Sequence, residues 1–250
     1  MKIFDIKVKN NMNYQEIFEK NKQKQIELIK SNKPFHSTRN YKNQADDLIN
    51  KAYGFKNSYE NTMSIDADNN PIPWMTYSSV FYLSQLDLSE CDIFEWGSGN
   101  STLYFSKRAK SVTTVESNKD WYEYVLETKP ENVDLNLVDI ENYASIIKNK
   151  NKKYDIISID GDIFRRFECA YFAVDYLKKG GMIIVDNSDW LENTTKYLRE
   201  KDFIQVDFAG MGPINNYMWC TSIFLSRDFN LKNISKQPSF VKGGVLNERD

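Results

Sequence analysis

A glycine-containing segment at residues 94–101 and an acidic residue further along the chain have the types and spacing of a nucleoside-binding site. Gly97 and Gly99 stand between a short apolar run and an amphipathic one, where glycines allow a sharp turn and the close approach of a ligand. Glu116 ends the next apolar run, 17 residues after Gly99. A carboxylate that binds ribose hydroxyls is expected at a spacing of about 20. The combination predicts a nucleoside-containing cofactor across the ends of two strands.

The residues around the glycines distinguish two kinds of cofactor. A dinucleotide site requires a third glycine where this chain has Thr102, and Glu95 would repel a pyrophosphate. The same carboxylate would attract the amino group of a methionine moiety. The charge argument therefore favours S-adenosylmethionine (SAM) over NAD. An NAD(P)-linked Rossmann oxidoreductase and a non-catalytic nucleoside-binding module remain as alternatives.

Carboxylates also gather where two later strands are expected to end, at Asp160, Asp162, Asp186 and Asp189. Like charges this close repel one another unless a cation or a proton intervenes. Oxygen ligands suit Mg²⁺, so one hypothesis is a divalent-cation site. The alternative is that residues 186–188 form a polar turn that caps the following helix.

The elements that must position these residues follow from hydrophobic patterning. Short apolar runs alternate with longer amphipathic ones, which predicts a Rossmann-like, doubly wound α/β sheet, mostly parallel, with helices on both faces. The last two strands are joined by an irregular loop and should form an antiparallel C-terminal hairpin. We expect strands at residues 92–95, 112–116, 133–138, 155–160, 182–185, 203–208 and 219–225, with Gly180-Gly181 as a turn. Helices are expected at residues 46–52, 77–86, 101–109, 121–126, 143–147, 164–177 and 191–200, and the apolar stripe from Phe164 to Leu177 should face the core.

The pattern Glu95-x-Gly97-x-Gly99-x-Ser101 resembles motif I of class I SAM-dependent methyltransferases. The similarity continues through residues 115–116, 159–162 and 180–186, and it covers roughly residues 75–225. The last two segments are similar to bacterial small-molecule methyltransferases of the "methyltransferase domain 24" kind. In that family the sheet has seven strands, and the last is antiparallel.

The resemblance implies a role for each residue that matches a motif. Glu95, Gly97 and Gly99 would line the methionine part of SAM, and Glu116 would bind its ribose hydroxyls. Asp139 would lie near the adenine amino group. The full set of expected cofactor-binding residues is Glu95, Gly97, Ser98, Gly99, Ser101, Glu116, Ser117, Asp139, Ile140 and Asp160.

The resemblance also implies an acceptor side of the site, and here Asp160 would face the methyl group. Asp160 and Asp162 are the catalytic candidates, because an oxygen acceptor needs deprotonation and the only histidine, His36, lies near the N-terminus. Asp160, Asp186 and Asn187 resemble the metal triad of catechol-type O-methyltransferases. Residues 73–77 and 210–217 flank the expected pocket. Their aromatic and asparagine side chains would suit a sugar or another polar ring.

Composition limits the remaining choices. The 250 residues carry 33 basic and 35 acidic side chains, so no overall basic excess points to nucleic acid or an anionic membrane. The start has no signal-peptide core and no apolar run approaches the ~20 residues of a membrane span. Three distant cysteines suggest a reducing cytoplasm.

Loop-forming residues at 66–73 place a domain boundary there. We expect a helical N-terminal extension at 1–70 that serves as a lid or an oligomer contact, such as that of a homodimer. The SAM-binding methyltransferase domain is expected at 71–228 and a tail at 229–250. The predicted function is methyl transfer to an oxygen of a small-molecule acceptor such as a sugar or secondary metabolite.

Overall fold

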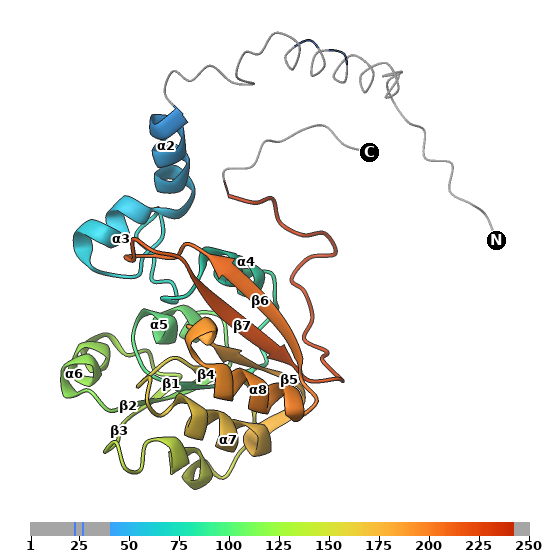
Figure 1. The fold of residues 1–250 in the computed structure, drawn as a ribbon. Helices are drawn as coiled ribbons and strands as arrows, with labels where there is room; N and C mark the ends of the chain where they lie inside the picture. The colour runs from blue at the N-terminus through green and yellow to red at the C-terminus, as the bar shows by residue number, and fades with distance from the viewer. Residues whose placement is uncertain (1–22, 24–26, 28–40, 243–250) are drawn as a thin grey trace. The chain divides into compact units, whose positions relative to one another are not determined.

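A seven-stranded sheet lies at the centre of the computed structural model, which describes residues 23, 27 and 41–242 (Figure 1). The strand order is β3-β2-β1-β4-β5-β7-β6. The first five strands are parallel, whereas β7 is antiparallel to both β5 and β6. The strands are β1 (Asp92–Trp96), β2 (Ser111–Glu116), β3 (Val133–Leu137), β4 (Tyr154–Ile159), β5 (Leu177–Val185), β6 (Ile204–Gly210) and β7 (Trp219–Leu225). The predicted seven strands and the antiparallel hairpin are confirmed.

Burial on both faces explains why the central strands read as nearly continuous apolar runs. In β1, Phe94 and Trp96 belong to the core on one side of the sheet, and Ile93 belongs to the core on the other. Helices cover both faces, as a largely parallel sheet requires. The edge strand β6 is mostly exposed, and it carries polar residues such as Gln205 and Asp207.

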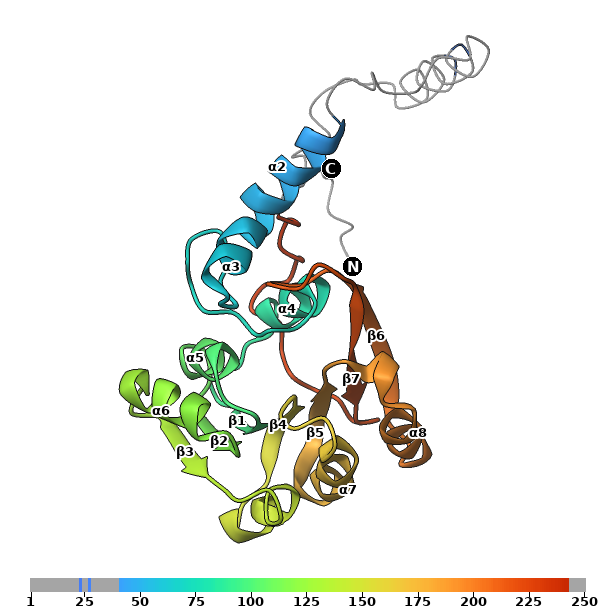
Figure 2. The ribbon, with the colours of Figure 1, turned by 60° about the vertical axis from the view of Figure 1, so that its left-hand side comes forward.

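The two faces carry different helices (Figure 2). Buried residues of α4 and α5 pack on one face, and those of η1, α7 and α8 pack on the other. The helices of the described region are α2 (Tyr41–Tyr53), α3 (Phe55–Asn61), α4 (Tyr77–Ser84), α5 (Asn100–Ser106), α6 (Lys119–Thr128), α7 (Arg166–Tyr176) and α8 (Glu192–Glu200), with short 3₁₀ helices η1 (Ala144–Lys150) and η2 (Ser188–Trp190).

The apolar stripe from Phe164 to Leu177 was predicted to face the core, and that prediction is confirmed only at its end. Val174 packs against the core and Leu177 is buried in it, whereas the first three members of the stripe are exposed. Phe164 is 88% exposed, and Phe167 and Tyr171 are also exposed. The buried face of the helix consists of small residues, among them Cys169 and Ala173. Small side chains let the helix approach the sheet closely, so the large rings lie outside, where Phe167 and Tyr171 contact Tyr197 of α8.

Two local elements also differ from expectation. Gly180-Gly181 does not form a turn before the strand; both lie within β5, whose pairing with β4 shifts register. Gly180 has φ +86°, so this is an irregularity inside a strand of the kind that glycine permits. Residues 144–150 form a 3₁₀ helix rather than an α-helix.

The chain divides into two units, and Ile49–Lys242 forms the one that contains the sheet. The proposed boundary at residue 70 stays a prediction. The helical periodicity at residues 14–29 and the single histidine, His36, lie outside the described residues. No helix among the described residues combines the length and apolar character that a membrane crossing requires.

Candidate active site

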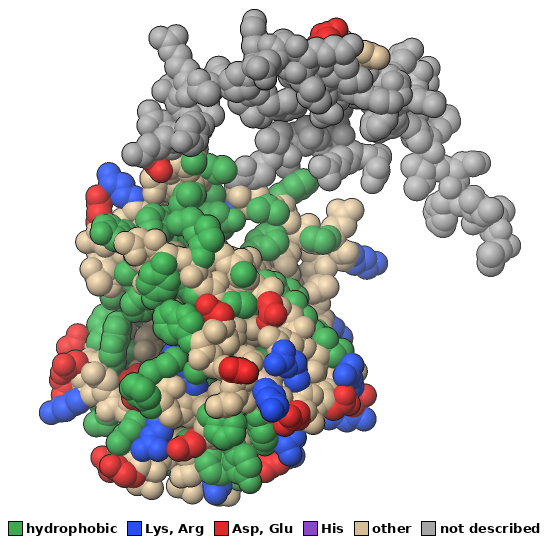
Figure 3. All heavy atoms as spheres, in the orientation of Figure 1, with side chains coloured by type: hydrophobic (Ala, Val, Ile, Leu, Met, Phe, Trp, Pro, Cys, Tyr) green, Lys and Arg blue, Asp and Glu red, His purple; other side chains and the backbone are tan. Residues whose placement is uncertain are grey.

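A cleft of about 420 Å³ opens at the carboxyl ends of β1, β2, β4 and β5. It lies where the order of the parallel strands reverses, since β1 pairs with β2 on one side and with β4 on the other. Figure 3 shows a hollow on this face with hydrophobic side chains around it. The predicted residues that line the cleft are Gly97, Ser98, Gly99, Ser101, Glu116, Ser117, Asp160, Asp162, Asp186 and Asn187.

The turn after β1 depends on glycine for a steric reason. Gly97 has φ +100°, and a Cβ there would lie 2.9 Å from the Cα of Gly161 in the neighbouring loop. Gly97 N–H also donates to the Val115 carbonyl at 2.9 Å, so the turn is fixed to β2. At Gly99 a Cβ would meet nothing within 4 Å, so this backbone borders open space. The turn therefore offers a ligand bare backbone at the start of α5.

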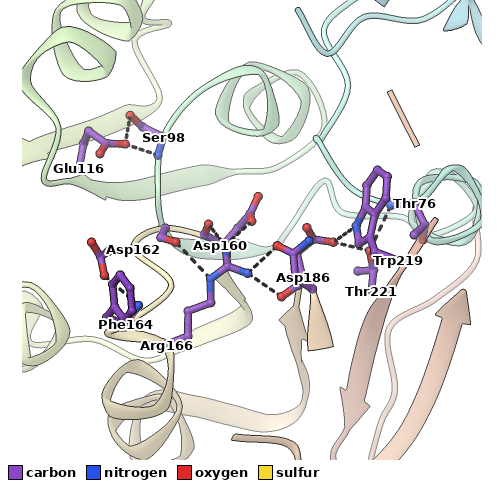
Figure 4. Close-up of polar contacts among 12 residues, drawn as sticks. Thr76, Ser98, Glu116, Asp160, Asp162, Phe164, Arg166, Asp186, Trp219 and Thr221 are labelled. Atoms are coloured by element: carbon purple, nitrogen blue, oxygen red, sulfur yellow. Dashed lines mark hydrogen bonds and ion pairs between the residues drawn. The ribbon is translucent and has the colours of Figure 1, made fainter. Parts of the chain in front are cut away.

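The carboxylate of Glu116 is oriented by four donors at the end of β2 (Figure 4). Ser98 donates to Oε2 from its backbone N–H at 2.9 Å and from its hydroxyl at 3.1 Å. The backbone N–H groups of Ser117 and Asn118 donate to Oε1, each at 2.9 Å. A carboxylate has about four lone-pair positions, so Glu116 is saturated. A ribose hydroxyl can bind Oε2 once the Ser98 hydroxyl rotates away.

Glu95 lies beneath the glycine turn and does not line the cleft. Its side chain is buried, and Oε2 has no hydrogen-bond partner. Burial raises the pKa of Glu95 to about 7, against the lowering effect of hydrogen bonds from Thr102 and Ser101. An unpartnered carboxylate oxygen in this position favours a positively charged ligand group over a phosphate.

Two further expected cofactor residues, besides Glu95, lie outside the cleft lining. Asp139 is exposed in the loop after β3, and Ile140 packs against the core on the α7 side of the sheet. Their assignment to the adenine end stays a prediction.

Arg166 at the start of α7 links the ends of β4 and β5. From their position in the sequence, Arg165 and Arg166 could either clamp an anionic acceptor or form a surface ion-pair network with Asp162 or Glu168. Its Nη2 lies 3.1 Å from Asp160 Oδ1. Its Nη1 donates to the Asp186 carbonyl at 2.6 Å and to Asn187 Oδ1 at 3.0 Å, and Nε donates to the Gly161 carbonyl at 3.1 Å (Figure 4). The guanidinium is buried and fully engaged with the protein.

The predicted metal triad of Asp160, Asp186 and Asn187 is not supported. Arg166 already supplies the cation that contacts two of these residues by side chain and the third by its backbone carbonyl. Within the described part of the chain, no three His, Cys, Asp or Glu side chains are grouped to hold an ion. The carboxylate repulsion that suggested a metal is relieved by a guanidinium, and we derive no chemistry from a divalent cation.

Asp186, at the end of β5, is held from behind by β7. Its Oδ1 accepts a hydrogen bond from Trp219 Nε1 at 2.9 Å and one from Thr221 Oγ1 at 2.5 Å. Burial raises the pKa of Asp186 to about 6, although these two hydrogen bonds lower it. Burial and the nearby Asp186 charge also raise the pKa of Asp160, against Arg166. Asp162 Oδ1 accepts the Phe164 N–H at 2.9 Å.

Aromatic side chains surround the mouth of the cleft. Trp74 and Tyr217 belong to the segments that the sequence placed beside the pocket, and Trp121 and Trp190 join them. Sequence reasoning missed two groups, Thr62–Ser64 before α4 and the indoles of Trp121 and Trp190. Asn100 Nδ2 donates to the Ser64 carbonyl at 2.7 Å, which ties the first group to α5. No sequence motif marks that long-range contact.

Neither a family model nor a curated protein matches this sequence. Solved structures are similar in fold. The O-methyltransferase TomG of Streptomyces achromogenes, in complex with SAM, is 13% identical with a TM-score of 0.49, covering 72% of this chain and 90% of TomG. The precorrin-6y C5,15-methyltransferase of Geobacter metallireducens is 14% identical with a TM-score of 0.49, covering 65% and 96%.

A third similar structure is a candidate methyltransferase from Streptococcus mutans in complex with S-adenosylhomocysteine (SAH). It is 16% identical with a TM-score of 0.46, covering 58% of this chain and 93% of that protein. At this level of similarity the functional argument depends on the residues of the present cleft.

Proposed function

We propose that this protein is a SAM-dependent methyltransferase that methylates a hydroxyl oxygen of a small polar molecule, such as a sugar or a secondary metabolite. The observation that carries the proposal is the buried, unpartnered carboxylate of Glu95 beneath the glycine turn, with Glu116 at the end of the next strand. The first carboxylate would attract a cationic amino group placed at the glycine turn, and a ribose hydroxyl would take the place of the Ser98 hydroxyl at the second. A pyrophosphate would be repelled by both carboxylates.

The residues present fit SAM. Gly97, Ser98 and Gly99 would lie against its methionine part, with Glu95 behind them, and Glu116 would accept its ribose hydroxyls. When bound, SAM supplies a methyl group on a positively charged sulfur, which is already activated for transfer. The protein must therefore chiefly position the acceptor and exclude water.

The acceptor side of the cleft carries the predicted catalytic residues Asp160 and Asp162. Both line the cleft, each with one oxygen already engaged by the protein: Asp160 by Arg166 and Asp162 by the Phe164 N–H. We assign them to hydrogen bonds with acceptor hydroxyl groups. The three described cysteines, Cys91, Cys169 and Cys220, are free, which accords with work in the cytoplasm.

Calorimetry with SAM, SAH and NAD⁺ tests the proposal. We expect dissociation constants in the micromolar range for SAM and SAH, and no binding of NAD⁺. Glu116→Gln keeps the shape of the side chain and removes its charge, and it should weaken SAH binding at least tenfold. Binding of NAD⁺ without SAM or SAH would establish the oxidoreductase alternative and refute ours.

The non-catalytic alternative is tested separately. A binding module would bind SAH yet transfer no methyl group to any acceptor, whereas the enzyme transfers labelled methyl from SAM to a small hydroxylated molecule.

A further inference from the structure

The half of the cleft beyond Asp160 has a charge pattern that restricts what can bind there. Three carboxylates, Asp160, Asp162 and Asp186, line it. Of the lining residues in the described part of the chain, Arg166 alone carries positive charge, and its donors are already taken by Asp160, Asn187 and backbone carbonyls. An acceptor that placed a phosphate or carboxylate here would be repelled without a free cation to bind it. The charge pattern therefore disfavours an anionic acceptor.

A ladder of three aromatic rings leads from the mouth of the cleft to Asp186. Trp190 and Tyr217 are 56% and 46% exposed, and their centroids lie 6.2 Å apart with 34° between the planes. A ligand ring sandwiched between the two side chains would need about 7 Å, which is twice a contact distance of about 3.5 Å, so no ring fits between them. A ligand can therefore pack only on the outer surface of the pair, which we call the Trp190–Tyr217 platform. Tyr217 lies 5.9 Å from Trp219, which is only 3% exposed and donates to Asp186 Oδ1.

Around this platform the wall includes polar side chains as well as apolar ones. Asn187 and Asn215 line the cleft beside the carboxylates. Planar apolar ligands are usually enclosed by hydrophobic walls, with few polar contacts. An aromatic platform faced by amides and carboxylates instead matches a saturated ring, whose C–H face packs on the platform while its hydroxyl groups form hydrogen bonds.

Asp186 has the position to act on such a hydroxyl. Both of its side-chain donors, Trp219 and Thr221, reach Oδ1. Oδ2 therefore has no side-chain donor among the described residues, while Asp186 lines the cleft. Asp160 and Asp162 each use an oxygen to hold Arg166 or the start of α7. Asp186 differs from these two in that a pair of β7 side chains fixes its Oδ1. Its remaining contact is with the backbone N–H of Asn187, which also donates to the carboxylate.

We propose that the methyl acceptor is a neutral, polyhydroxylated ring of the pyranoside type that packs on the Trp190–Tyr217 platform and gives its hydroxyl proton to Asp186. This inference rests on the proposed methyl transfer. The acceptor oxygen forms the C–O bond, the C–S bond of SAM breaks with its electron pair left on sulfur, and the proton passes to Asp186 and then to water. The products are the methyl ether, neutral SAH and one proton. Trp219 and Thr221 are positioning residues, because they act through Oδ1.

The first experiment uses the full chain with ¹⁴C-methyl-labelled SAM and three sets of probes. These are neutral methyl pyranosides (glucose, galactose, mannose, rhamnose and N-acetylglucosamine), the corresponding uronic acids, and catechol. SAH binding is measured in parallel, so a protein that does not bind SAH refutes the proposed function rather than this inference. We expect transfer to at least one neutral pyranoside and at least tenfold less to its uronic acid. If SAH binds but label reaches no pyranoside, or reaches only a uronic acid or catechol, the inference is refuted.

The second experiment distinguishes the binding role of the Trp190–Tyr217 platform from the proton-accepting role of Asp186 by measuring KM and kcat separately. Trp190→Ala should raise KM for the pyranoside about fivefold with kcat within twofold, since ring packing of this kind is worth about 1 kcal/mol. The matched control is Tyr171→Ala, a similarly exposed aromatic on α7 outside the cleft lining, which should change neither constant. Equal effects of the two substitutions would refute the platform.

Asp186→Asn should lower kcat at least 100-fold with SAH affinity within twofold, in line with the loss of a general base. Trp219→Phe keeps an aromatic ring but removes the indole N–H. That N–H stabilises the charged form of Asp186 in the wild type, so its loss should raise the pKa of Asp186. The acid limb of the kcat profile, expected near pH 6, should therefore move to higher pH. Asp160 and Arg166 face the same carboxylate and are unchanged in this variant. If Asp186→Asn retains kcat, or if Trp219→Phe lowers stability without moving the limb, Asp186 is not the base.

Discussion

Replacing Glu95 by Gln should make the unliganded protein more stable and the cofactor complex weaker. The pKa of Glu95 rises from 4.5 to about 7 on folding because the charged form loses water and gains too few donors. A shift of about 2.5 units corresponds to roughly 3 kcal/mol, at about 1.36 kcal/mol for each unit. Folded Glu95 binds its proton more tightly than unfolded Glu95. Its contribution to stability is therefore full below pH 4.5 and is lost as the pH rises through about 7.

The comparison is made by urea denaturation of the wild type and of Glu95→Gln at pH 5 and pH 8. Gln resembles the protonated acid, so the two proteins should differ little at pH 5. At pH 8 the variant should be more stable by about 3 kcal/mol. Glu123→Gln is the matched control, because this exposed glutamate pairs with Lys119 on the surface of α6. It should change stability by less than about 0.5 kcal/mol at either pH.

The same variant should bind SAM 10–100-fold more weakly at pH 8, because a hydrogen bond between charged partners is worth about 1.5–3 kcal/mol. Wild-type affinity should also rise between pH 6 and pH 8 as Glu95 loses its proton, whereas the affinity of the variant should be flat. If Glu95→Gln destabilises the protein equally at both pH values, Glu95 is a structural hydrogen-bond partner. If SAM affinity is unchanged, Glu95 does not face the amino group, and the charge argument against NAD is lost.

Two further predictions concern the cofactor side of the cleft. Ser98→Ala removes the hydroxyl that competes for Glu116 Oε2, so SAH should bind as tightly as to the wild type or up to about threefold tighter by calorimetry; a tenfold loss would mean that the Ser98 hydroxyl itself binds the ligand. Gly97→Ala places a Cβ at φ +100° and 2.9 Å from Gly161, so thermal denaturation should show a loss of more than about 2 kcal/mol, and an unchanged melting temperature would contradict the described turn.

The fold could be predicted because most strands of this chain are marked by the same pattern, a short run of apolar residues. Residues 93–96 and 156–159 read as short apolar runs since both faces of the sheet are covered, and the irregular 211–218 loop precludes a crossover between β6 and β7. Hydrophobic spacing gave a wrong prediction for the first part of α7. Large apolar residues at helical spacing indicated the core, but the sheet is approached through Cys169 and Ala173, and the rings lie outside.

The cofactor side of the cleft was accessible from sequence for a related reason. Gly97, Gly99 and Glu116 sit at fixed offsets from strand ends, so local spacing contains their geometry. The acceptor side was less accessible, because it is assembled by contacts distant in sequence. Trp219 and Asp186 are 33 residues apart, and Asn100 and Ser64 are 36 apart. Arg166 shows what the sequence could not predict. Its position after β4 was clear, but its hydrogen bonds to backbone carbonyls of two loops depend on where α7 begins.

The two raised carboxylates connect stability to the reaction. Glu95 and Asp186 are both buried, and burial disfavours the charged form of each. A ligand that brings a positive charge to Glu95 removes that penalty, and at 100 times its dissociation constant any ligand of the folded state stabilises it by about 2.7 kcal/mol. This is close to the roughly 3 kcal/mol of folding stability that the protein loses at pH 8 because buried Glu95 is ionised. SAM at 100 times its dissociation constant should therefore restore at pH 8 about the stability that the unliganded protein has at pH 5. A ligand without the amino group should restore markedly less at the same free concentration, because it binds with a larger dissociation constant.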